Sequence, residues 1–473
     1  MEIKFGTDGW RAIIAEDFTV QNVRYCTQAL AEHLIESEKA SQGIVIGYDT
    51  RFASERFAAS AAEVMAGNGI PVFLCSGTAP TPMVSFGTRY YDAAGGIVIT
   101  ASHNPPEWNG FKIKDGSGAS AAPAIEADIE HRIPEIVAAD RFSRLPLVEG
   151  IDDKLISWND LYPAYSERIG QLVDLKGIAG AGFKIIVDSM YGAGSGYFKK
   201  LAGEGSTVWR EIHGERNPIF PGIKQPEPIA ANLTELATTV KESGADVGLA
   251  TDGDADRLGI VDENGLALTP LQIFGLLALY LLEVQGQRGA IVRTITTTSM
   301  VNRLAEQYGV PVFETGVGFK HVAPIMVAED ALIGGEESSG FGFRGHVPER
   351  DGLLAGLFFL DLMSRTGRKP SELVEHLYSR VGPHHYHRED IVFPSVDRQK
   401  ISDRLIAGPY DFLGGSEIVE VKTIDGFHFS FRDHSWLLIR FSGTEPLLRV
   451  YSEAKSLSRA KELVSAARNW LKV

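Results

Sequence analysis

Three aspartates at alternate positions are the clearest chemical feature of the chain. The segment "TDGDADR" places Asp252, Asp254 and Asp256 directly after the apolar run "ADVGLA". Carboxylates this close repel one another, so a hard divalent cation is the expected partner. Three protein carboxylates leave coordination positions open on Mg²⁺, which often also binds substrate phosphate. The loop therefore predicts a Mg²⁺ site, and a solvated acidic turn is the alternative.

The same spacing also begins an EF-hand loop, and Glu263 falls at the twelfth position of that pattern. The sixth position of an EF-hand must be glycine for its sharp turn, whereas this chain has Arg257 there. The flanking segments "ADVGLA" and "LGIVDENG" are strand-like, where an EF-hand has helices. The sequence excludes the EF-hand interpretation.

A second reactive segment is "TASHNPPEWNGFKIK", in which Ser102 precedes His103 and Lys112 follows. Ser102 could be a hydrolase nucleophile, a phosphate carrier or an ordinary turn serine. A hydrolase serine needs a base that a third group orients, and a histidine adjacent in sequence usually points elsewhere. The G-x-S-x-G elbow is also absent. These observations disfavour the hydrolase.

The segment "GGEESSG" offers polar groups to a ligand. In "GGEESSG", Glu336 and Ser338 could bind vicinal sugar hydroxyls, although a helix N-terminus with acidic residues is an equal alternative. The nearby "PERDG" is expected to position this loop or to cap the following helix.

The segment "RFSGTEPLLRVY" has the composition of an anion-binding turn. Ser442, Gly443 and Thr444 can present N–H and hydroxyl donors to a phosphate. Arg440 and Arg449 flank them and suit bidentate phosphate contacts. The alternative is a strand–turn–strand with a surface arginine pair.

The elements that must position these loops alternate along the chain. Apolar runs such as "GIVIGYDT", "GGIVITASH", "FKIIVDSM" and "ADVGLATD" predict buried strands that end in polar loops. Between them lie helical patterns, including one that begins after Thr19 as a plausible N-cap. The alternation predicts layered α/β domains, with ligand sites at the carboxyl ends of strands. Composition shifts divide the chain into residues 1–150, 151–265, 266–380 and a smaller α+β segment, 381–473.

Composition limits the classes of function. The net charge of −15 argues against general binding of nucleic acid or acidic membranes, because both need a basic face. The two cysteines, Cys26 and Cys75, form no CxxC pattern and fit a reducing compartment. The longest apolar run, "LQIFGLLALYLLEV", is shorter than the roughly 20 residues of a membrane span. We expect a cytoplasmic protein, and the sequence carries no signal for its oligomeric state.

Taken together, "TASHNP", "TDGDADR", "GEES" and "RFSGTEP" occur in the order that characterises the α-D-phosphohexomutase superfamily, which the chain resembles. The opening "KFGTDGWRA" is also similar to the family's N-terminal pattern, so the resemblance covers essentially the whole chain. It implies an α/β protein of four domains around a central cleft, three layered α/β domains and a smaller C-terminal α+β domain.

The resemblance also implies roles for individual residues. Ser102 would carry the phosphoryl group, and Mg²⁺ would be held by that group with Asp252, Asp254 and Asp256. Around the transferring phosphoryl the family places polar groups that correspond here to His103, Lys112 and Arg257. Substrate contacts would come from Arg11, Lys320 and His321 of "GVGFKH", Glu336, Ser338, Arg440, Ser442, Gly443, Thr444 and Arg449.

The implied activity is interconversion of hexose 1- and 6-phosphates through a bound bisphosphate, with hexose phosphates as the only expected partners. "GEESSG" lacks the Gly-His ending of the phosphomannomutase pattern G-E-M-S-G-H and of the phosphoglucosamine mutase pattern G-E-Q-S-G-H. It looks more like the phosphoglucomutases, with glucose 1,6-bisphosphate as activator. The alternatives are a glucose 1,6-bisphosphate synthase, a phosphomannomutase and a non-catalytic sugar-phosphate binding protein.

Overall fold

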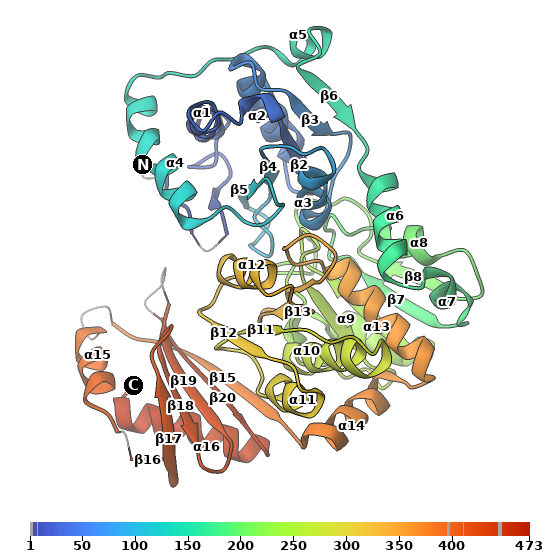
Figure 1. The fold of residues 1–473 in the computed structure, drawn as a ribbon, viewed down its shortest axis with the longest axis vertical. Helices are drawn as coiled ribbons and strands as arrows, with labels where there is room; N and C mark the ends of the chain where they lie inside the picture. Colours follow the sequence, from blue (N-terminus) through green and yellow to red (C-terminus); the bar gives the residue numbers. More distant parts are fainter. Residues whose placement is uncertain (1–2, 7, 395–397, 410, 443–446) are drawn as a thin grey trace.

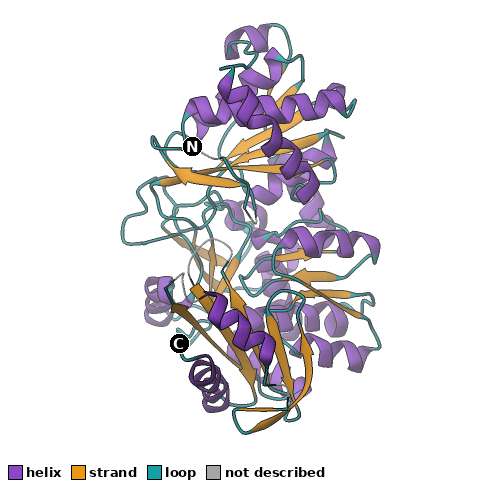
Figure 2. Ribbon diagram, turned by 90° about the vertical axis from the view of Figure 1, so that its left-hand side faces the viewer, coloured by secondary structure: helices purple, strands orange, loops and turns teal. Residues whose placement is uncertain are grey.

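The computed structural model describes residues 3–6, 8–394, 398–409, 411–442 and 447–473. Its strands form four separate sheets that follow one another along the chain (Figure 1). Three are mixed sheets layered with helices, and the fourth is antiparallel (Figure 2). The predicted fold class is confirmed: three α/β domains and a C-terminal domain of different architecture. We call them domains I to IV after their sheets; the predicted boundaries and central cleft stay predictions.

Domain I has a six-stranded sheet in the order β1-β5-β4-β2-β3-β6. The predicted strands "IVIGY" and "GGIVI" are β2 and β4, and every residue in them is buried, as expected for parallel strands covered on both faces. The Thr19 side chain accepts a hydrogen bond from the Asn22 N–H and begins α1, as predicted. The elements are β1 (Trp10–Ile13), α1 (Val20–Glu36), β2 (Ile44–Tyr48), α2 (Ser54–Gly67), β3 (Val72–Cys75), α3 (Thr81–Tyr90), β4 (Gly95–Ile99), β5 (Trp108–Asp115), α4 (Pro123–Ala138), α5 (Leu147–Asp152) and β6 (Ile156–Asn159).

Domain II has a four-stranded sheet in the order β10-β9-β7-β8, with β10 antiparallel to β9. The predicted strands "KIIVD" and "VGLAT" are β7 and β9. The elements are α6 (Tyr162–Leu172), α7 (Leu175–Gly180), β7 (Lys184–Asp188), α8 (Tyr197–Ala202), β8 (Val208–Ile212), α9 (Thr234–Ser243), β9 (Val247–Thr251) and β10 (Leu258–Val261).

Domain III has a sheet in the order β12-β11-β13-β14. Its helix α13 is buried over most of its length and packs against α10 and against α7 and α8 of domain II. The elements are β11 (Ile291–Thr294), β12 (Val312–Thr315), β13 (Ile333–Gly335), β14 (Phe341–Phe343), α10 (Pro270–Leu279), α11 (Met300–Tyr308), α12 (Phe319–Ala328), α13 (Gly352–Thr366) and α14 (Pro370–Val381).

Domain IV is an antiparallel sheet with two different faces. Helices α15 and α16 cover one face through Leu405, Leu463 and Leu471. On the other face Trp436 and Tyr451 pack against Ile295 of domain III. The elements are β15 (His385–Val392), α15 (Arg398–Ala407), β16 (Phe412–Leu413), β17 (Ser416–Lys422), β18 (Phe427–Phe431), β19 (Trp436–Phe441), β20 (Leu447–Ala454) and α16 (Leu457–Leu471).

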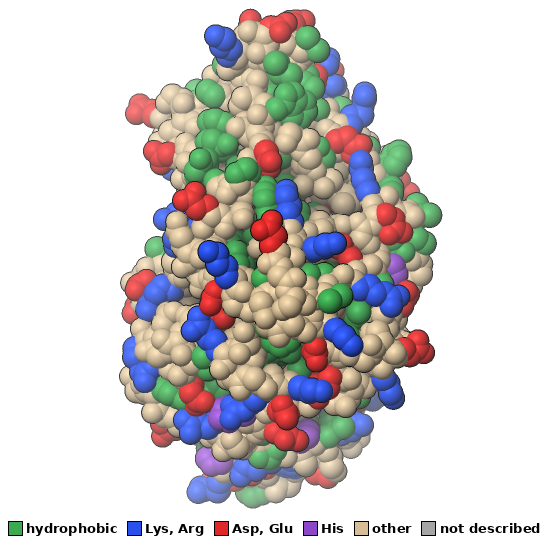
Figure 3. All heavy atoms as spheres, turned by 90° about the vertical axis from the view of Figure 1, so that its right-hand side faces the viewer, with side chains coloured by type: hydrophobic (Ala, Val, Ile, Leu, Met, Phe, Trp, Pro, Cys, Tyr) green, Lys and Arg blue, Asp and Glu red, His purple; other side chains and the backbone are tan. Residues whose placement is uncertain are grey.

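Each sequence motif lies at the carboxyl end of a strand. The serine loop follows β4, the aspartate loop β9, the glutamate loop β13 and the last loop β19. No helix in the described part of the chain has the length and apolar character to cross a bilayer. Acidic and basic side chains are interspersed over the face drawn in Figure 3.

Candidate active site

Ser102 lies in the loop between β4 and β5 and is buried, with 1% of its surface exposed. Its hydroxyl donates to Asp252 Oδ2 at 2.8 Å, across the boundary between domains I and II. Its backbone is left-handed, with φ of +50°, and its N–H donates to Thr100 Oγ1 at 2.8 Å. A Cβ at Gly253 would lie 2.3 Å from the Ser102 carbonyl oxygen, so only glycine allows the two loops to approach this closely.

The three aspartates form one buried cluster. Asp252, Asp254 and Asp256 each offer a carboxylate oxygen within 4.8 Å of the others, and all three are fully buried. Asp252 Oδ1 accepts the backbone N–H groups of Asp256 and Arg257, which shapes the loop. Burial and the neighbouring carboxylates raise the pKa of Asp252 well above its usual range.

The donor set fits a hard divalent cation. Asp254 Oδ1 and Asp256 Oδ1 are buried and accept no hydrogen bond within the described part of the chain. Buried carboxylate oxygens without partners are costly unless a cation uses them. Three carboxylate ligands with neighbouring open positions suit Mg²⁺, which keeps sites for phosphate and water.

Lys112 brings positive charge to the cluster from β5. Its ammonium lies 2.8 Å from Asp254 Oδ2, 2.6 Å from Asp8 Oδ2 and 3.5 Å from Asp256 Oδ2. Although burial opposes it, the charges of Asp254 and Asp8 raise the pKa of Lys112 above its usual range. Lys112 is therefore a permanent cation within the carboxylate cluster.

His103 lies next to Ser102, and Arg257 lies near the aspartates, with its Nε 4.0 Å from Asp252 Oδ2. His103 Nδ1 is 3.4 Å from the Ser102 hydroxyl, longer than the bond from that hydroxyl to Asp252. Burial and the positive charge of Arg257 lower the pKa of His103 well below its usual range, so the imidazole is neutral at pH 7. Arg257 NH1 pairs with Glu227 Oε1 at 2.8 Å.

Two charged residues of this cluster were not predicted. Arg350 NH2 lies 2.7 Å from Asp256 Oδ2 and 2.8 Å from Asp8 Oδ2. From the sequence, the "PERDG" segment was assigned only a positioning or capping role, and Asp351 does cap α13 by accepting the Leu354 N–H. The second unpredicted residue is Asp8. The sequence held a signal for both residues, because Asp8 lies in "KFGTDGWRA" and Arg350 in "PERDG", two segments quoted above.

The glutamate loop lies next to the cluster. Glu336 Oε1 accepts the Gly318 N–H at 3.1 Å, and its other oxygen is 3.5 Å from Arg350 NH1. Burial raises the pKa of Glu336 to about 7. Ser338 is half-buried, and Glu337 accepts the Thr296 hydroxyl.

The other predicted contacts of domains I and III are Arg11, Lys320 and His321. Arg11 NH1 donates to Asn104 Oδ1 at 2.7 Å, in the serine loop. Lys320, at the start of α12, reaches the Gly6 carbonyl at 3.4 Å and Glu126 at 3.6 Å. His321 is exposed on α12.

The predicted arginine pair lies in domain IV. Arg440 and Arg449 lie directly opposite each other on β19 and β20. Arg440 Nε donates to Asp425 Oδ1 at 2.8 Å, and Asp425 Oδ2 accepts the Val317 N–H of domain III at 3.0 Å. The Ser442 N–H donates to the Leu447 carbonyl. Gly443 and Thr444, also predicted to bind phosphate, lie outside the described residues.

Four family models match the chain in sequence order. They describe domains I, II, III and the C-terminal domain of phosphoglucomutase/phosphomannomutase, over residues 2–140, 163–265, 269–381 and 398–469. The chain belongs to the phosphoglucomutase/phosphomannomutase family. Its members are α-D-phosphohexomutases, so this protein is an enzyme of the intramolecular phosphotransferase type, acting on sugar phosphates.

Individual relatives of this phosphohexomutase cover almost its full length. A phosphoglucomutase/phosphomannomutase of Thermococcus kodakarensis is 33% identical, covering 97% of this chain and 96% of its own. A "probable phosphoglucosamine mutase" of Pyrococcus abyssi is 31% identical, covering 99% and 97%. The crystal structure of a "putative phosphomannomutase" from Thermus thermophilus is 34% identical in sequence, with a TM-score of 0.86 and full coverage of both chains. The relatives' names differ in the sugar they specify.

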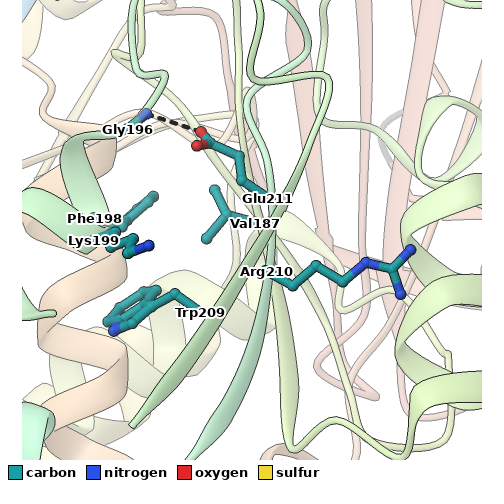
Figure 4. A pocket seen from close by; sticks show the side chains of 7 residues that line it. All are labelled: Val187, Gly196, Phe198, Lys199, Trp209, Arg210 and Glu211. Atoms are coloured by element: carbon teal, nitrogen blue, oxygen red, sulfur yellow. Dashed lines mark hydrogen bonds between the residues drawn. The ribbon is translucent and has the colours of Figure 1, made fainter. Parts of the chain in front are cut away.

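A small pocket on domain II is separate from this site. It is lined by Val187, Phe198, Lys199, Trp209 and Glu211, among others. Figure 4 shows Arg210 pointing away from Lys199 and Trp209, and the Glu211 carboxylate accepts the Gly196 N–H at 2.9 Å. Its polar groups do not converge on one point, so we assign it no ligand.

Proposed function

We propose that this phosphohexomutase interconverts glucose 1-phosphate and glucose 6-phosphate, with Ser102 as the phosphoryl carrier. The observation that carries the proposal is the 2.8 Å hydrogen bond from the Ser102 hydroxyl to Asp252 in the carboxylate cluster. This bond supports a carrier oxygen at the edge of a site for Mg²⁺. The "GEESSG" composition favours glucose over mannose or glucosamine.

In the proposed reaction, phosphoserine gives its phosphoryl group to the C6 hydroxyl of glucose 1-phosphate. The bond from phosphorus to Ser102 Oγ breaks, a bond to O6 forms, and the hydroxyl proton ends on Oγ. Glucose 1,6-bisphosphate turns around within the site and returns its other phosphoryl group to Ser102. Such transfers need in-line positioning and neutralisation of oxygen charge more than covalent help from the protein.

Each group of the site has a part in this scheme. Lys112, Arg257 and Arg350 neutralise phosphoryl oxygens near Ser102. Mg²⁺, held by Asp252, Asp254 and Asp256, would add charge neutralisation when bound. Neutral His103 lies near the carrier oxygen as a hydrogen-bonding group rather than a cation.

The substrate itself is held farther out. Glu336 and Ser338 bind sugar hydroxyls, with Lys320, His321 and Arg11 as further contacts. Arg440, Arg449 and the residues Ser442, Gly443 and Thr444 hold the phosphate that is not being transferred.

A phosphorus NMR time course tests the proposal. The protein receives Mg²⁺, glucose 1-phosphate and a trace of glucose 1,6-bisphosphate, with mannose 1-phosphate and glucosamine 1-phosphate in parallel runs. Glucose 6-phosphate as the fastest product supports the proposal. Accumulation of the bisphosphate would indicate a synthase. Faster turnover of mannose 1-phosphate or glucosamine 1-phosphate would mean that this sugar phosphate, and not the glucose one, is the substrate. No turnover of any sugar phosphate would overturn the assignment.

A further inference from the structure

A buried arginine lies against the backbone of the serine loop. Arg51 follows β2 and is completely buried. Its two terminal NH groups donate to four carbonyl oxygens, three in the loop from β4 to β5 and one on Trp108, the first residue of β5. These oxygens belong to Ser102 at 2.7 Å, Asn104 at 2.6 Å, Pro105 at 2.7 Å and Trp108 at 2.9 Å. One guanidinium therefore fixes the whole turn that carries Ser102.

Arg51 is itself held from two sides. Asp49 Oδ2 lies 3.1 Å from its Nε, and Asp49 Oδ1 accepts its backbone N–H and the Ser54 hydroxyl. The ring of Phe220, from domain II, lies over the guanidinium at 5.1 Å from the ring centroid. The planar cation is thus clamped between domains I and II, and a clamped guanidinium loses little further freedom when it forms its bonds.

The held turn contains two groups of the proposed reaction. Ser102 has left-handed backbone geometry, which a non-glycine residue keeps only where its surroundings enforce it. The carbonyl oxygen of Asn104 accepts a hydrogen bond from Arg51, and its side-chain oxygen accepts one from Arg11. The position of Arg51 therefore sets both the carrier oxygen and Arg11, one of the predicted substrate contacts.

We propose that Arg51 is a positioning residue for phosphoryl transfer, acting through the serine loop and not on the phosphate. Its terminal donors are all directed at carbonyl oxygens of residues 102–108, so its part is to hold Ser102 Oγ in line with the transferred phosphoryl group. This inference rests on the proposed role of Ser102. Lysine cannot replace it, because an ammonium has no planar fork to reach four carbonyls.

The test compares Arg51→Lys with Arg216→Lys in the full-length protein. Arg216 is a matched control because it lies at the same seam between domains I and II. It donates to the backbone carbonyls of Thr50 and Arg51 and pairs with Glu55, outside the serine loop. Both variants keep their charge. The readouts are kcat and KM for the best substrate of the NMR panel, with thermal melting as the check on folding.

We expect Arg51→Lys to lower kcat about a hundredfold, the loss typical of a misplacement near 1 Å, while KM changes by less than about threefold. Arg216→Lys should keep kcat within about twofold. A near-normal kcat in Arg51→Lys, an equal loss in both variants, or a rise in KM with unchanged kcat would overturn the inference. A wild-type protein with no turnover would instead count against the proposed function.

A second variant covers the case in which Arg51→Lys does not fold. Phe220→Leu keeps Arg51 but removes the aromatic face that holds it. We expect kcat to fall about threefold or more at constant KM, in proportion to a lost cation–π contact. An unchanged kcat in folded Phe220→Leu would contradict the clamping of Arg51.

Discussion

Ser102 combines the proposed chemical role with a backbone conformation that serine avoids. A left-handed φ costs an L-residue roughly 1–2 kcal/mol, and glycine pays no such cost. The φ of +50° at Ser102 is therefore a constraint separate from the chemistry of its hydroxyl.

Replacement of Ser102 should separate these two properties. Ser102→Ala and Ser102→Gly both remove the carrier oxygen, so we expect turnover to disappear in both. Ser102→Gly should have a free energy of unfolding about 1 kcal/mol higher than Ser102→Ala, because glycine adopts this φ freely. Thermal melting and the NMR assay measure the two effects.

A control is Ser206→Ala, whose hydroxyl bonds the Gly180 carbonyl far from the cluster, and it should stay active. Near-normal turnover in Ser102→Ala would refute the carrier role. Equal stability of the two Ser102 variants would refute the conformational cost.

Glu336 predicts a pH dependence of stability. Burial raises the pKa of Glu336 from 4.5 to about 7, so the folded state keeps a proton that the unfolded state releases between these values. Stability therefore falls as pH rises from about 4.5 to 7, by at most about 3 kcal/mol. Since Glu336→Gln is neutral throughout, the melting temperature of the wild type minus that of the variant should fall between pH 5 and pH 8. A constant difference would contradict the raised pKa.

At the scale of elements, the aspartate loop is the part most dependent on a ligand. Mg²⁺ would use the buried oxygens of Asp254 and Asp256 that have no hydrogen-bond partner in the described part of the chain. A ligand that binds only the folded state stabilises it by about 2.7 kcal/mol at a hundred times its Kd. Mg²⁺ should therefore raise the melting temperature, and EDTA should reverse the shift and stop turnover.

Asp256→Asn should lose most of this shift, because it removes a charged ligand. Asp262→Asn, in the turn after β10, changes an aspartate that binds the Asn264 and Leu266 N–H groups instead. It should melt earlier but keep the Mg²⁺ shift. An equal shift in both variants would place the cation elsewhere.

The strands β2, β4, β7 and β9 were predictable because all of their residues except Lys184 are buried. Each of β2, β4, β7 and β9 is a short apolar run followed by polar residues, and the sequence shows that change directly. The three aspartates were equally visible because they share one loop.

Contacts between domains were not predictable from one sequence. Arg350 reaches Asp256 from domain III, and Arg51 receives Phe220 from domain II. Hydrophobic periodicity describes which face of an element is buried, but not which distant side chain will meet a given charge. The contacts that join loops of different domains, such as those of Arg350 and Arg51, are therefore seen only in the structure.

At the scale of the whole molecule, Glu453 of domain IV accepts hydrogen bonds from Ser299 of domain III and so connects the two domains. Its Oε1 accepts the Ser299 N–H at 2.9 Å, the Ser299 hydroxyl at 2.5 Å and the Trp436 indole N–H at 3.0 Å. Glu453→Ala would leave three donors without their acceptor in a buried contact. We expect docking of domain IV to weaken by about 3 kcal/mol.

Calorimetry should show this loss as an earlier unfolding transition, and limited proteolysis as faster cleavage between α14 and β15. Glu420→Ala, whose side chain is 55% exposed on β17, should change neither result. An unaltered melting profile in Glu453→Ala would mean that the apolar contact of Trp436 and Tyr451 with Ile295 suffices for docking.

Two consecutive peptide groups connect the arginine pair with the glutamate loop. The Val317 N–H donates to Asp425, which holds Arg440, and the Gly318 N–H donates to Glu336. Because backbone amides make both bonds, a scan of side-chain truncations would pass over Val317 without a phenotype, and only proline there would delete its donor. Mutagenesis should therefore detect this connection through its two acceptors, Asp425 and Glu336. Substitutions of these two residues should have similar phenotypes although the residues lie in different domains.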